Sequence, residues 1–104
     1  MIKLQNCELE IAVKLHGAEL CSIVKNGCEH LWNADAAIWA RHSPVLFPIV
    51  GRVWDNRYRV LNREYSLPQH GFARDMDFTP VEQTPCSATF VLESNEDTLA
   101  KYPY

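Results

Sequence analysis

The sequence lacks several features that would place it in a familiar class of protein. No apolar run approaches the ~20 residues that span a bilayer, and residues 1–6 contain no apolar signal-peptide segment. We therefore expect a cytoplasmic protein without a membrane partner. The 10 basic side chains are outnumbered by 13 acidic ones, so the overall charge does not favour nucleic acid as a partner either.

Spacings typical of metal, redox and hydrolase sites are also missing. None of the four cysteines forms a C-x-x-C pair, the histidines show no H-E-x-x-H spacing, and Ser43 has no G-x-S-x-G setting. Cys28 and His30 can share a strand face, but two ligands make a poor metal site. We therefore expect no metal and no cofactor. Cys21 and Cys86 are interpreted as small core residues, and all four thiols are expected to be reduced.

The sequence does contain a series of short segments in which apolar and other residues alternate. Its 104 residues are 47% hydrophobic and 22% charged, which is typical of a single globular domain over residues 1–104. Turn signals recur roughly every 8–12 residues, a spacing typical of an all-β antiparallel sandwich or barrel. Asn-Gly at positions 26 and 27 predicts a type I′ hairpin turn. The strands are predicted at residues 8–15, 18–25, 29–32, 57–61, 63–67, 77–83 and 87–94, with helical turns within residues 33–42 and 94–104.

Two segments stand out as candidate binding sites. The segment Phe-Pro-Ile-Val-Gly-Arg ends in Arg52, whose guanidinium offers five donors suited to carboxylates, phosphates and sugar hydroxyls. The segment Gln-His-Gly-Phe-Ala-Arg places Gln69, His70 and Arg74 in one loop. A hairpin separates the two segments and returns the chain, so we expect these four side chains to line one concave surface. Simpler readings stay open, because Arg52 can pack on its own sheet and the loop can cap a strand.

Aromatic residues near these segments have two possible roles. Phe47 and Phe72 lie inside them, and Trp32, Trp39 and Trp54 lie nearby in the sequence. Together they are enough for a sugar-stacking surface, although packing in a core explains most aromatic residues. Core packing is therefore the expected role for most of them.

Taken together, these segments resemble the aldose 1-epimerase (galactose mutarotase-like) superfamily, and in particular its LacX-like branch. The ordered pair F-P-x-x-G-R and Q-H-G-F-A-R is the most specific part of the resemblance. The resemblance covers essentially all 104 residues. It is also carried by residues 17–20, 31–35, 39–46, 67–68 and 94–96.

The resemblance implies a fold and a reaction. The fold is an incomplete antiparallel β-sandwich, and the reaction interconverts the α and β anomers of an aldose or aldose phosphate. A general acid protonates the ring oxygen while a general base takes the proton of the C1 hydroxyl, and no metal is required. By resemblance, Arg52 and His70 match sugar-contacting positions. Gln69 and Arg74 match substrate-contacting positions of the sugar-phosphate branch, where Arg74 would face the phosphate.

The chain departs from the family in its length. Family members are considerably longer, and their catalytic histidine acid and glutamate base come from later strands that have no counterpart in this sequence. We therefore expect an N-terminal fragment that has no catalytic residue and is inactive alone. The alternative is a non-catalytic carbohydrate-binding or assembly β-domain. Because a sandwich cut partway leaves sheet edges unpaired, we also expect a homo-oligomer.

Overall fold

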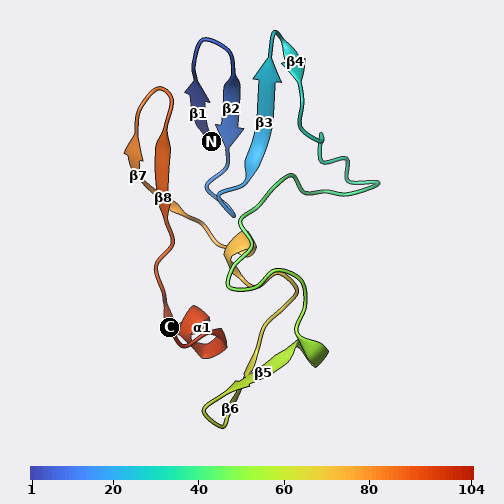
Figure 1. Ribbon diagram of the computed structural model, residues 1–104, viewed down its shortest axis with the longest axis vertical. Helices are drawn as coiled ribbons and strands as arrows, with labels where there is room; N and C mark the ends of the chain where they lie inside the picture. Colours follow the sequence, from blue (N-terminus) through green and yellow to red (C-terminus); the bar gives the residue numbers. More distant parts are fainter.

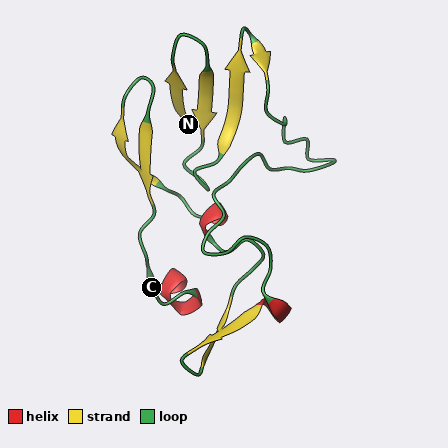
Figure 2. Cartoon of the chain, in the orientation of Figure 1, coloured by secondary structure: helices red, strands yellow, loops and turns green.

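The computed structural model describes all residues, Met1–Tyr104. The chain forms one four-stranded sheet in the order β1-β2-β3-β4 and two separate hairpins, β5-β6 and β7-β8, all antiparallel (Figures 1 and 2). Long loops join these units. The elements are β1 (Ile2–Gln5), β2 (Glu10–Val13), β3 (Leu20–Lys25), β4 (Cys28–Glu29), the 3-10 turn η1 (Trp54–Asn56), β5 (Arg57–Val60), β6 (Arg63–Ser66), the 3-10 turn η2 (Ala73–Asp75), β7 (Thr79–Gln83), β8 (Ala88–Val91) and the helix α1 (Glu96–Lys101).

Apolar alternation accounts for the four-stranded sheet. Leu4 of β1 lies opposite Ile11 of β2, which in turn lies opposite Ile23 of β3, so apolar side chains of three strands share one face. Asn26 and Gly27 both have positive φ, at 51° and 74°, which confirms the type I′ turn. The strand β1 was not predicted, because its four residues are too few for a distinct alternation.

The remaining hairpins and the helix follow the sequence prediction. Leu61 and Asn62 have positive φ and join β5 to β6, and β7 pairs with β8 as expected. At the start of α1, the Asn95 side chain accepts from the Thr98 backbone N–H at 2.9 Å, and the Thr98 hydroxyl oxygen accepts from the Asn95 N–H at 2.9 Å. This reciprocal capping box explains why the helix begins there.

Two details differ from the prediction, whereas the helical turn predicted within residues 33–42 is present, with the N–H groups of Ile38 and Trp39 donating to the Asp35 carbonyl. The strand after the Asn-Gly turn is only two residues long. Cys86 was interpreted as a core residue, which is wrong, because it is exposed in the turn between β7 and β8. Cys21 is half-buried, and all four cysteines are free thiols.

The chain is flat and has a small core. Its extents are 54 × 34 × 16 Å and its accessible surface is 7440 Å², whereas a compact protein of this mass exposes about 5,900 Å². Only 10 of the 104 residues are buried, and the main cluster consists of Leu67, Phe72 and Ala73. Large apolar side chains such as Ile38 and Trp54 remain exposed. None of the helices is long and apolar enough to cross a membrane.

Candidate functional site

The two candidate segments, residues 47–52 and 69–74, lie side by side in the middle of the molecule (Figure 1). The Phe47 carbonyl accepts hydrogen bonds from the N–H groups of Phe72, at 3.0 Å, and Ala73, at 3.2 Å. This approach depends on Gly71, which has a φ of +71°, because a Cβ there would lie 2.1 Å from the Phe47 carbonyl oxygen. The close contact predicted for the two segments is confirmed.

A second contact fixes the ring of His70. The His70 N–H donates to the Gly51 carbonyl at 2.7 Å, and the Gly51 N–H donates to His70 Nδ1 at 2.8 Å. In a neutral imidazole whose Nδ1 accepts a hydrogen bond, the proton resides on Nε2. His70 therefore offers an N–H donor at Nε2. Arg52, the residue directly after Gly51, has an exposed side chain with further donors.

Arg74 has different surroundings from His70. Its side chain is 18% exposed, its Nε is buried without a hydrogen-bond partner, and the same atom lies 3.7 Å from an Asp75 oxygen. The Arg74 carbonyl lies against Gly17, where a Cβ would come within 2.8 Å of it. Gln69, in contrast, is exposed beside His70. That all four side chains line one surface remains a prediction.

Asp75 contributes negative charge next to Arg74. The Arg41 guanidinium donates to an Asp75 oxygen at 2.7 Å, and this hydrogen bond is the main reason why the pKa of Asp75 lies below its ordinary value. The Asp75 carboxylate thus lies between two guanidinium groups. A phosphate that approached Arg74 would have to compete with this carboxylate.

An aromatic hollow of about 220 Å³ borders both segments. The ring centroids of Phe47 and Phe72 are 6.2 Å apart, and those of Phe47 and Tyr102 are 5.7 Å apart, both in edge-to-face contact. Tyr104 completes this side of the hollow. The two phenylalanines are recognisable as candidates from the sequence, but the two tyrosines are not, because their approach depends on how α1 directs the chain that follows it.

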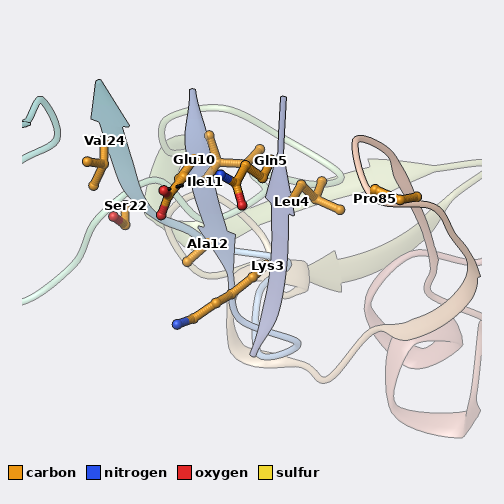
Figure 3. A pocket seen from close by; sticks show the side chains of 9 residues that line it. All are labelled: Lys3, Leu4, Gln5, Glu10, Ile11, Ala12, Ser22, Val24 and Pro85. Carbon is orange, nitrogen blue, oxygen red and sulfur yellow. Dashed lines mark hydrogen bonds between the residues drawn. The ribbon is translucent and has the colours of Figure 1, made fainter. Parts of the chain in front are cut away.

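A larger hollow, of about 470 Å³, lies over the four-stranded sheet. Figure 3 shows Lys3, Gln5, Glu10 and Ser22 on strands β1–β3, together with Pro85 from the turn between β7 and β8. It is lined by none of the four predicted site residues. Its lining mixes one ammonium, one carboxylate, an amide and a hydroxyl with aliphatic side chains, which is the character of a solvated sheet face.

Comparisons with known proteins identify relatives across the whole chain. The family model for aldose 1-epimerase matches residues 1–104. The chromosomal LacX protein of Lactococcus lactis is 37% identical over 109 residues, which cover 99% of this chain and 36% of LacX. The chain thus spans about a third of the length of the curated relatives it matches.

Solved structures show the same relationship. A galactose mutarotase related enzyme from Lactobacillus acidophilus superposes with a TM-score of 0.96 at 41% identity, over 99% of this chain and 35% of that enzyme. A galactose mutarotase-like protein from Lactobacillus casei also gives a TM-score of 0.96, at 37% identity, over 100% of this chain and 36% of that protein. The predicted fold, an incomplete antiparallel β-sandwich of the galactose mutarotase type, is confirmed. The chain belongs to the aldose 1-epimerase family.

Proposed function

We propose that this chain supplies the sugar-binding part of an aldose 1-epimerase-type site, in which Arg52 and His70 contact the aldose. The observation that carries the proposal is the pair of hydrogen bonds between Gly51 and His70, at 2.7 and 2.8 Å. The second of these bonds orients the imidazole and makes Nε2–H its donor, and Arg52 directly follows Gly51 in the sequence. Sugar hydroxyls require several converging hydrogen-bonding groups, and Arg52 and His70 supply donors.

The tautomer of His70 limits its role in the reaction. Anomer interconversion requires a base for the C1 hydroxyl and an acid for the ring oxygen. His70 Nδ1 already accepts from Gly51, and a neutral Nε2–H has no lone pair to take a proton. His70 therefore binds and orients the sugar, while the acid and base come from other residues.

The proposal assigns binding, and not turnover, to these 104 residues. Because they span about a third of the length of the LacX relatives, the acid and base are proposed to belong to the part of the site that this sequence does not contain. Gln69 and Arg74 are proposed to extend the site toward an aldose phosphate. The phosphate would then displace the Asp75 carboxylate from the partly exposed side chain of Arg74.

A non-catalytic assembly domain is the second candidate function. The large accessible surface of 7440 Å² and the exposed apolar side chains favour it. In this case the chain would pair with another polypeptide and would show no saturable response to sugars.

Tryptophan fluorescence titration with galactose, glucose and glucose 6-phosphate tests the proposed function. We expect saturable binding that Arg52→Ala and His70→Ala weaken by roughly tenfold, since each removes hydrogen bonds worth about 1–1.5 kcal/mol. Arg59→Ala is the matched control, because Arg59 is an exposed arginine on the adjoining β5 strand. Polarimetry is expected to show no mutarotation above background. Unchanged binding by both site variants would overturn the site, and turnover by the wild-type chain would overturn its assignment to binding alone.

A further inference from the structure

A second group of reactive side chains lies between β3 and the chain that leads into the Phe-Pro segment. A carboxylate oxygen of Glu19, the sulfur of Cys21 and a ring nitrogen of His42 lie within 4.8 Å of one another. The side chains of Glu19 and His42 are only 11% and 14% exposed. Three different ligand types thus converge in a largely buried place, and none of them belongs to the proposed sugar site.

The Nδ1 atom of His42 lacks a hydrogen-bond partner. This atom is buried and makes no hydrogen bond, and its distance of 3.9 Å to Glu19 Oε1 is too long for one. A buried polar atom without a partner costs free energy. Donors about 2.0 Å from a tetrahedral zinc ion are about 3.3 Å apart, so an ion between the two atoms, now 3.9 Å apart, would require them to approach by about 0.6 Å.

We propose that Glu19, Cys21 and His42 form a zinc site, with water as the fourth ligand. A thiolate, an imidazole and a carboxylate are the donors that zinc takes in proteins. The Cys21 thiol now donates to the Glu19 carbonyl at 3.0 Å. Binding breaks this S–H bond, forms a Zn–S bond and releases one proton to solvent.

The neighbouring charges leave a position for the ion. Lys14 lies 3.7 Å from Oε2 of Glu19, whereas Oε1 accepts the His42 backbone N–H at 2.6 Å. Oε1 thus already faces His42, and the Lys14 ammonium lies next to Oε2. A bound ion would tie β3 to His42 and so brace the segment that begins at Phe47. The sequence spacing did not indicate this site, because β4 and a long loop separate Cys21 from His42.

Cobalt(II), used as a spectroscopic probe, tests the proposal on the metal-free 104-residue chain. We expect one equivalent to give a cobalt–thiolate charge-transfer band and tetrahedral d–d bands, both of which excess Zn²⁺ removes. Cys21→Ser should abolish the charge-transfer band, and the matched control Cys28→Ser should retain it, because Cys28 is exposed on β4. His42→Gln should weaken Zn²⁺ binding by at least the roughly 10–100-fold that loss of an outer-shell partner costs.

Alkylation of the unsubstituted protein gives a second readout that does not depend on whether a variant folds. Zn²⁺ is expected to protect Cys21 from iodoacetamide while leaving the labelling of Cys7, Cys28 and Cys86 unchanged, as measured by peptide mass spectrometry. Equal labelling of Cys21 with and without Zn²⁺ would overturn the proposal. A cobalt–thiolate band that persists in Cys21→Ser would also overturn it.

Discussion

Replacing Gly71 with alanine tests the contact that holds the two site segments together. Gly71 has a φ of +71°, and a Cβ there would lie 2.1 Å from the Phe47 carbonyl oxygen and 2.5 Å from its carbonyl carbon. Both are backbone atoms, which cannot rotate away as the end of a side chain can. The two segments therefore have to separate if alanine occupies this position.

The expected loss of stability has two parts. A left-handed backbone conformation costs a residue with a Cβ about 1–2 kcal/mol. Moving Phe47 away breaks the hydrogen bonds from the N–H groups of Phe72 and Ala73, each worth about 1 kcal/mol. The sum, about 3–4 kcal/mol, is a large fraction of the roughly 5–15 kcal/mol that stabilises a typical domain.

Gly27→Ala is the matched control for this experiment. Gly27 has a φ of +74°, but nothing lies within 4 Å of the position that its Cβ would take. The Gly27→Ala variant should therefore lose only the conformational part of the free energy of unfolding, about 1–2 kcal/mol. Urea unfolding followed by circular dichroism measures both variants, and Gly71→Ala should also lose sugar binding. Equal losses of stability in the two variants would refute the argument that the segments depend on this close approach.

Three further predictions concern other parts of the chain. The Ser22 hydroxyl, followed by three backbone N–H groups, lowers the pKa of Glu29 from 4.5 to about 2. The resulting stabilisation is therefore present above pH 4.5 and is lost as the pH falls from 4.5 toward 2. Ser22→Ala should raise this pKa in a carbon NMR titration, and an unchanged pKa would contradict the assignment. The Tyr58 hydroxyl donates to the Lys101 carbonyl, so Tyr58→Phe should cost about 1 kcal/mol in urea unfolding; a loss no larger than that of Tyr65→Phe would argue against this hydrogen bond. The exposed apolar surface and the open sheet edges predict self-association that increases with concentration in light scattering, and a monomer at every concentration would contradict it.

Features determined by a few neighbouring residues could be predicted from the sequence. The Asn26–Gly27 turn follows from the ease with which these two residue types adopt positive φ. The capping box of Asn95 and Thr98 likewise depends on residues three positions apart. The contact between the two site segments was also predicted, because the hairpin between them returns the chain.

Features that depend on distant residues could not be predicted. The close approach of the Arg74 carbonyl to Gly17 joins residues that are far apart in the sequence. The tautomer of His70 depends on the N–H of Gly51, 19 residues away in the sequence. The exposure of Cys86 depends on which face of the β7–β8 turn meets the sheet, and a small apolar residue type does not specify this.

NMR spectroscopy can test whether Arg52 and His70 bind an aldose. Nitrogen–proton correlation spectra of the labelled chain, recorded during a galactose titration, report on the Gly51 amide, the Arg52 Nε–H and the His70 ring together. We expect saturable shifts that are largest at these three groups, with the His70 proton remaining on Nε2. Shifts confined to the residues of the large hollow, such as Lys3 and Ser22, or no saturable shift at all, would contradict it.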